Sequence, residues 1–114
     1  MEIYYVKRKL EKQCNSEKEA IKEWGPTVAK KLMQRLSQLA AFDNLAMVSH
    51  LPPLRLHQLS GNRKEQFGVD VIKNSFRIVL LPANEPLPLL DDGGVDKAKV
   101  TEIMILEVTN YHVE

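Results

Sequence analysis

Six side chains in the second half of the chain have the chemical types needed to cut RNA without a metal ion. That reaction needs a base to take the proton of a 2′-hydroxyl, cations to hold the phosphate as negative charge develops, and an acid for the leaving oxygen. An imidazole, guanidinium and ammonium groups, and a phenol can fill these roles. The candidates are His57, Arg63, Lys64, Arg77, Tyr111 and His112.

Each candidate also has a plainer structural interpretation. His57 is equally well explained as an outward strand residue that makes one hydrogen bond. Arg63 and Lys64 follow Gly61 in a polar segment and are typical of exposed turn charges, and Tyr111 with its neighbour fits an ordinary chain end. Only their combination favours a functional site.

Other kinds of site lack support in the sequence. The three histidines do not have the paired spacing of a zinc motif, Cys14 lies far from them, and DDGGVD does not follow the acidic alternation of an EF-hand loop. Glycine-rich phosphate loops are also absent. We therefore expect no metal and no small-molecule cofactor, and no motif supports a metabolic enzyme.

Length and composition predict one globular domain over residues 1–114, and the helices and strands expected along it, described below, place it in the α+β class. The 114 residues are 44% hydrophobic and 27% charged, enough to bury a core without cross-links. One cysteine cannot form an internal disulfide, and no apolar run is long enough for a membrane span or leader. We expect a cytoplasmic protein that does not bind membranes.

The net charge of +1 conceals an uneven distribution. Residues 1–50 carry nine Lys/Arg and six Asp/Glu, residues 51–81 carry five and two, and residues 82–114 carry two and seven. A basic body would suit a polyanionic partner if the fold keeps the acidic last third apart, although solvated surface charge also explains it.

The first half of the chain predicts a strand followed by helices. EIYYV at 2–6 has strand composition, and a polar helical run follows it. Ser16 and Glu19 form a capping box for a helix that ends near Trp24. Pro26 begins a longer amphipathic helix. Its apolar stripe is Val28, Leu32, Leu36 and Leu39, and its solvated arc is Lys30, Lys31, Gln34, Arg35 and Gln38.

The second half predicts an antiparallel meander and a central strand. Alternation of apolar and polar residues predicts strands at 54–57, 67–71 and 76–80, joined by SGNRKE and KNS. If their apolar face packs on the long helix, four polar residues share the other face or its rim: Arg55, His57, Asp70 and Arg77. Residues 82–96 predict a surface connection, and VTEIMILEV predicts a central strand, because it is apolar on both faces.

The segments LRLHQLSGNRKEQFGVDVIKNSFRIVL and VTEIMILEVTNYH resemble the HigB-type plasmid maintenance killer proteins of the RelE/ParE toxin superfamily. The resemblance covers roughly the last 60 residues. It implies two to three N-terminal helices packed on one face of a small, mainly antiparallel sheet of four to five strands. It also implies the toxin of a toxin-antitoxin pair, with a helix-turn-helix antitoxin, the ribosome and mRNA as partners.

The activity that this resemblance implies is ribosome-dependent mRNA cleavage by 2′-hydroxyl attack. His57, Tyr111 and His112 would serve proton transfer and substrate placement, and Arg77 would hold the scissile phosphate. Further RNA contacts would come from Arg63, Lys64 and Asn110. Two positions depart from the family pattern: many relatives have an aspartate in place of Asn110 and a lysine in place of Ser60.

A second hypothesis remains open. A non-enzymatic or attenuated protein of the same fold could act as a killer suppressor or as a partner in an antitoxin complex. A helical DNA-binding antitoxin is disfavoured, because alternating strands occupy the second half of the chain where a helix-turn-helix would be needed.

Overall fold

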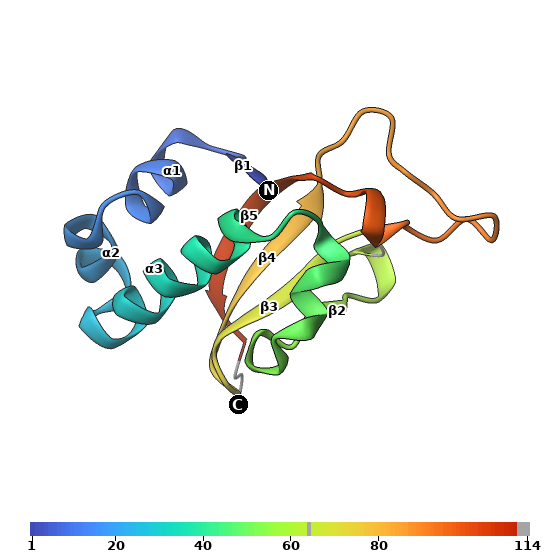
Figure 1. Ribbon diagram of the computed structural model, residues 1–114. Coiled ribbons are helices and arrows are strands. Elements are labelled where there is room, and N and C mark those ends of the chain that lie inside the picture. Colours follow the sequence, from blue (N-terminus) through green and yellow to red (C-terminus); the bar gives the residue numbers. More distant parts are fainter. Residues whose placement is uncertain (64, 112–114) are drawn as a thin grey trace.

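One five-stranded sheet organises the protein (Figure 1). The computed structural model describes residues 1–63 and 65–111. Strand order is β1-β5-β4-β3-β2, with β1 parallel to β5 and the other neighbours antiparallel. The α+β class and the mainly antiparallel sheet agree with the sequence prediction. The strands are β1 (Glu2–Tyr5), β2 (His57–Gln58), β3 (Phe67–Ile72), β4 (Phe76–Pro82) and β5 (Glu102–Asn110).

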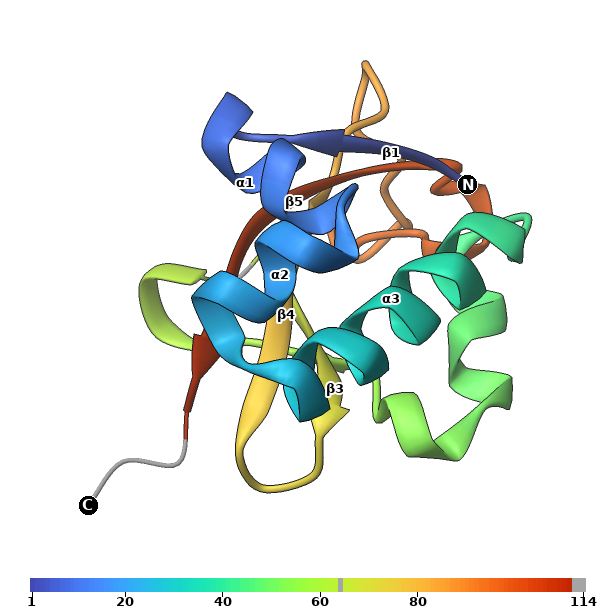
Figure 2. The ribbon, with the colours of Figure 1, turned by 90° about the vertical axis from the view of Figure 1, so that its left-hand side faces the viewer.

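Three α-helices lie on one side of this sheet (Figure 2). They are α1 (Arg8–Cys14), α2 (Glu17–Trp24) and α3 (Pro26–Ala41). The predicted cap is present, since the Ser16 hydroxyl accepts a hydrogen bond from the Glu19 N–H at 3.2 Å. Pro26 occupies the first turn of α3, where its missing N–H costs nothing.

The core lies between α3 and the sheet. The predicted apolar stripe of α3 is buried along its whole length and joins one cluster with the helix-facing residues of the strands. Those strand residues alternate along each strand, as a half-covered sheet requires. They are Phe67, Val69, Val71, Ile78, Leu80, Ile103, Ile105 and Val108.

Arg35 corrects the prediction of a fully solvated arc on α3. The side chain is buried, and its Nε donates to the backbone oxygen of Asp70 at 3.1 Å. Strand β2 pairs only with Phe67 and Gly68, so the outer edge of β3 has no strand partner at Asp70. Arg35 donates the hydrogen bond that this edge carbonyl needs, which explains why a cationic side chain of α3 can be buried here.

The segment before β2 also differs from prediction. The expected strand at 54–57 is instead the end of a 3₁₀ helix (Pro52–Leu54), a left-handed residue at Arg55, and a strand that begins at His57. Pro52 and Pro53 favour this turn, and the N–H groups of Leu54 and Arg55 donate back to the oxygens of Leu51 and Pro52 at 3.0 and 2.9 Å, so neither N–H can join a ladder. An unpredicted 3₁₀ helix, Leu45–His50, precedes it and buries Leu45 and Val48.

The rest of the second half follows the prediction. β3 and β4 form a hairpin, and β5 is an interior strand between β1 and β4. Residues 83–101 leave the sheet in a long excursion (Figure 1), whose tip is closed by a bridge between Leu89 and Val95. Within residues 1–63 and 65–111, no helix has the length and apolarity needed to cross a bilayer.

Candidate functional site

The face of the sheet opposite α3 gathers most of the residues that the sequence singled out. Gly68 and Asp70 alternate with the core residues of β3. In the antiparallel ladder Gly68 pairs with Val79, and Asp70 pairs with Arg77 of β4. His57 on β2 pairs with Gly68, and Thr109 on β5 pairs with Arg77. Since opposite residues of an antiparallel pair point to the same face, His57, Asp70 and Arg77 share this face as expected.

Asp70 is the centre of the polar network on this face. Its carboxylate is buried and accepts hydrogen bonds from Arg55 Nε at 2.9 Å and Arg55 Nη2 at 3.2 Å. The Tyr111 hydroxyl donates to the Asp70 Oδ1 atom at 3.2 Å. A buried carboxylate needs such donors, and here they also fix the position of two other side chains.

Arg55 reaches Asp70 because its own backbone is left-handed. Its φ of 43° and ψ of 55° are uncommon for a residue with a β-carbon. The bidentate hydrogen bonds to Asp70 are the main cause that raises the pKa of Arg55 above its usual value. Arg55 is therefore a cation already neutralised by a carboxylate.

His57 is oriented by two features of the backbone. Its Nδ1 lies 2.8 Å from the Arg55 carbonyl oxygen. A carbonyl only accepts, so Nδ1 must carry the proton, and in the neutral imidazole Nε2 then holds a free lone pair. The ring lies directly over Gly68, where a β-carbon would come within 2.7 Å of Cε1 and 2.9 Å of Nε2. Glycine leaves the space that this ring fills.

Arg77 lies next to this imidazole, and no described residue of opposite charge is paired with it. The β-carbon position that is 2.7 Å from the His57 ring is also 3.5 Å from Arg77 Cδ. In the described part of the chain no carboxylate forms an ion pair with Arg77, and its solvent-shielded Nε has no hydrogen-bond partner. Arg77 as a whole is partly exposed, so its positive charge is available to an anion.

Tyr111 positions Arg77 rather than standing free. Its ring lies under the guanidinium, with Arg77 Cζ 5.0 Å from the ring centroid, a cation–π distance. The hydroxyl donates to Asp70 and accepts from the Asn74 N–H at 2.9 Å, while the Tyr111 N–H donates to the Ser75 oxygen. Both hydroxyl functions are occupied, so this phenol is better placed as a support than as an acid.

The remaining predicted residues are placed less closely. Arg63, in a 3₁₀ turn at Gly61–Arg63, pairs with Glu107 of β5 at 3.6 Å, and both side chains are about half exposed. Asn110 ends β5 opposite Phe76 and is exposed. Lys64 and His112 lie outside the described residues.

A hollow of about 460 Å³ opens beside this network. Three cations line it, and Asp70 is its one carboxylate. The lining of the hollow has a net positive charge. The surface that attracts an anionic ligand therefore extends beyond Arg77. The lining residues are Arg35, Pro52, Pro53, Arg55, Asp70 and Lys73.

Sequence reasoning placed Asp70 on this face but gave it no role, and it gave none to Gly68 or Glu107. An aspartate in the middle of an otherwise apolar strand is a signal for a buried polar partner, and it could have been used. The need for glycine opposite His57 depends on the pairing register. That register is not visible in the sequence.

Comparison of the chain with protein-family models, with curated proteins and with solved structures gave no match. Among residues 1–63 and 65–111, no three His, Cys, Asp or Glu side chains are close enough together to hold a metal ion. The class of site therefore has to be inferred from its own geometry: an imidazole held by a backbone carbonyl, beside a guanidinium that has no ion-pair partner among the described residues.

Proposed function

We propose that the protein is a metal-independent endoribonuclease, the toxin of a bacterial toxin-antitoxin pair with a RelE-like fold, which cuts mRNA on the ribosome in the cytoplasm. The observation that carries the proposal is the pairing of His57 with Arg77. His57 keeps a lone pair on Nε2, and the partly exposed Arg77 beside it has no ion-pair partner among the described residues. A base and an anion-binding cation are the two groups that 2′-hydroxyl attack on a phosphodiester needs first.

In this mechanism His57 Nε2 takes the proton of the 2′-hydroxyl as its oxygen attacks the adjacent phosphorus. Arg77 holds the non-bridging phosphate oxygens, whose negative charge increases as the new P–O bond forms. The bond between phosphorus and the 5′-oxygen of the next nucleotide breaks, this oxygen takes a proton from solvent water, and a cyclic 2′,3′-phosphate remains on the first nucleotide. Tyr111 and Asp70 hold Arg77 in place, and Arg63 with the hollow beside Asp70 supplies further positive charge.

A second candidate is the attenuated protein of the same fold, and two ion pairs favour it. Asp70 neutralises Arg55, and Glu107 neutralises Arg63, so Arg77 is the one arginine on this face of the described chain without a carboxylate partner. A site with less available positive charge binds RNA more weakly. The two candidates differ in whether the chain cuts RNA at all.

The deciding experiment adds purified protein to ribosomes translating a defined message and maps the 5′ ends of the fragments. We expect cleavage that requires the ribosome and is reduced by a factor of roughly 100 or more in His57→Ala and Arg77→Ala, the range lost with a general base or an oxyanion donor. Lys18→Ala, in α2 and away from this face, is the matched control for loss of an exposed cation. No cleavage by the unmutated chain would exclude the enzyme and favour the attenuated protein.

A further inference from the structure

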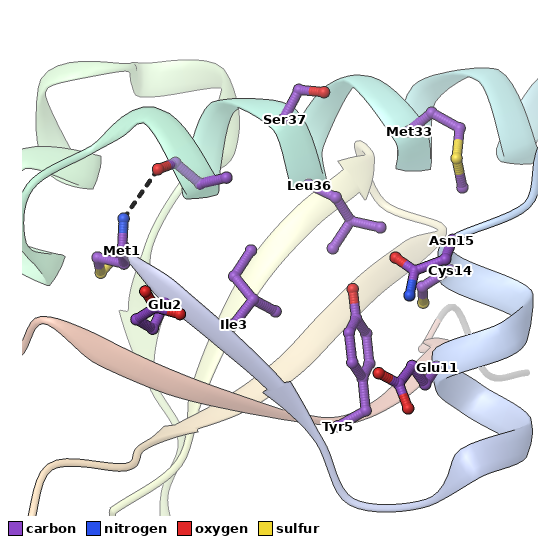
Figure 3. Close-up of a pocket in the computed structure, with 11 residues that line it drawn as sticks. Met1, Glu2, Ile3, Tyr5, Glu11, Cys14, Asn15, Met33, Leu36 and Ser37 are labelled. Atoms are coloured by element: carbon purple, nitrogen blue, oxygen red, sulfur yellow. Dashed lines mark hydrogen bonds between the residues drawn. The ribbon is translucent and has the colours of Figure 1, made fainter.

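A second region, the cleft beside β1, has a different chemistry from the proposed RNA site (Figure 3). It has a volume of about 470 Å³ and lies between β1, α1 and α3. Ile3 and Tyr5 point from β1 toward α3, and Leu36 and Met33 descend from α3 on the other side (Figure 3). The floor is therefore apolar.

The groups inside the cleft are not reactive. Burial raises the pKa of the Cys14 thiol to about 12, and burial is also the main cause that raises the pKa of the Tyr5 hydroxyl to about 12. Both groups keep their protons at neutral pH, so the cleft holds no thiolate nucleophile. Its chemistry is that of binding.

The strand that forms one wall of the cleft has an unpaired edge. β1 is the outermost strand, and its residues bond to β5 in alternation: the N–H of Glu2 donates to Thr101 and the N–H of Val6 donates to Ile105, at 3.0 and 3.1 Å. By the parallel ladder geometry, the N–H and C=O groups of Ile3 and Tyr5 then point away from β5. The residues whose side chains enter the cleft also present the free backbone groups.

Exposed apolar side chains continue this edge on the other face of β1. Tyr4 is 45% exposed and Val6 is 48% exposed, although both are large hydrophobic residues in or next to a strand. A strand added beside β1 would cover them with one set of its alternating side chains. Its other set would enter the mouth of the cleft.

The charge of the rim selects among possible strands. Glu2 and Glu11 line the cleft; its one cation among the lining residues is the N-terminal ammonium of Met1, which already donates to backbone oxygens at the end of α3. A second copy of the chain, paired through its own β1, would bring these carboxylates toward those of the first copy. A segment that carries cations on the cleft side meets opposite charge instead.

We propose that the open edge of β1 and its cleft bind an extended segment of another protein, which adds to the sheet as a sixth strand. The segment carries an apolar residue for the cleft, flanked by Lys or Arg for Glu2 and Glu11 at the rim. Main-chain hydrogen bonds to Ile3 and Tyr5 supply affinity, and the cleft and rim supply specificity. The proposal does not depend on RNA cleavage.

The probe is a capped peptide, lysine-valine-leucine-valine-lysine, titrated into the isotope-labelled full chain. We expect amide NMR shifts centred on residues 2–6, and slower hydrogen exchange of the Ile3 and Tyr5 amides in the complex. The double variant Glu2→Lys/Glu11→Lys should weaken binding by about tenfold or more, since two favourable charge contacts become repulsive. The matched control is Glu17→Lys/Asp91→Lys, which changes two exposed carboxylates away from the cleft and should leave binding unchanged.

Two control peptides test the binding mode. One has glutamate in place of both lysines, and the other is methylated on every backbone nitrogen, so that it cannot pair with a strand edge. Both should bind at least about tenfold more weakly. The proposal is overturned if the peptide does not bind, if its shifts map elsewhere, or if methylation or rim inversion leaves affinity unchanged. It is also overturned if β1 pairs with β1 of a second copy in solution.

Discussion

The face that carries His57 and Arg77 and the cleft beside β1 are built in opposite ways. On the first, a buried carboxylate, Asp70, fixes Arg55 and Tyr111, and these in turn orient an imidazole and a guanidinium. In the cleft, backbone donors and acceptors and apolar side chains stand open at a strand edge. The contrast separates a site whose groups are held in place before a ligand arrives from one that an incoming chain would complete.

The largest effect expected from this contrast concerns stability. Asp70→Ala removes a buried acceptor of three hydrogen bonds and leaves Arg55 and the Tyr111 hydroxyl without it, which should lower the free energy of unfolding by about 2–4 kcal/mol. Glu11→Ala, at the rim of the cleft, should change it by less than about 0.5 kcal/mol because the side chain is exposed. Urea unfolding measures both. Equal losses would contradict the view that one region is prebuilt.

The second effect concerns the orientation of His57. In Gly68→Ala the new methyl group would lie within 2.7 Å of the imidazole, so the ring must move away from the Arg55 carbonyl. We expect cleavage to fall by a factor of about 10–100, the order of loss that follows a small misplacement of a catalytic group. The cost in stability should be about 1–2 kcal/mol.

Gly94→Ala is the control for this substitution, because its new methyl group meets only the Asp92 and Leu90 side chains in the surface excursion. Ribosome-dependent cleavage should persist in this variant. A fully active Gly68→Ala protein would show that the ring position over Gly68 is not the working one.

The third effect separates two arginines that flank the same carboxylate. Arg77→Gln removes an unpaired cation, whereas Arg55→Gln removes one that is already neutralised. Binding to single-stranded DNA, which lacks the 2′-hydroxyl and cannot be cut, should weaken more in Arg77→Gln. The slope of log K against log salt should fall by about 0.7 for that variant and by less for Arg55→Gln. Fluorescence anisotropy measures both slopes, and identical slopes would remove the distinction.

The elements that sequence predicted well are those with a long, consistent period. The stripe of α3 repeats at steps of four, four and three, and β3 alternates through Phe67, Val69 and Val71, so one packing arrangement satisfies each. The segment at 54–57 also alternates, but over four residues only. There the two prolines and the left-handed Arg55 decide the conformation, and neither effect depends on hydrophobic pattern.

The sequence was enough to predict which residues form the candidate site, but not which of them form hydrogen bonds with one another. Alternation on three strands is enough to place Arg55, His57, Asp70 and Arg77 near one face. The bond from Tyr111 to Asp70 depends on the register of three strands, which shifts between Asp70 and Ile72 and again between Val79 and Leu80. Such irregularities follow from tertiary packing and leave no local pattern.

The smallest effect belongs to the cleft and appears only at high pH. The unfolded chain ionises Tyr5 near pH 10, while the folded protein keeps this proton up to about pH 12, so between these values the unfolded state binds fewer protons and stability falls as pH rises. Tyr5→Phe removes this contribution and should lose less stability between pH 9 and 11 than the unmutated chain. Tyr4→Phe, on the exposed face of the same strand, is the control and should follow the unmutated protein. The measurement is the urea midpoint of each protein at the two pH values. If Tyr5→Phe and the unmutated chain lose the same stability between pH 9 and 11, the Tyr5 hydroxyl is not buried in the cleft but in contact with water.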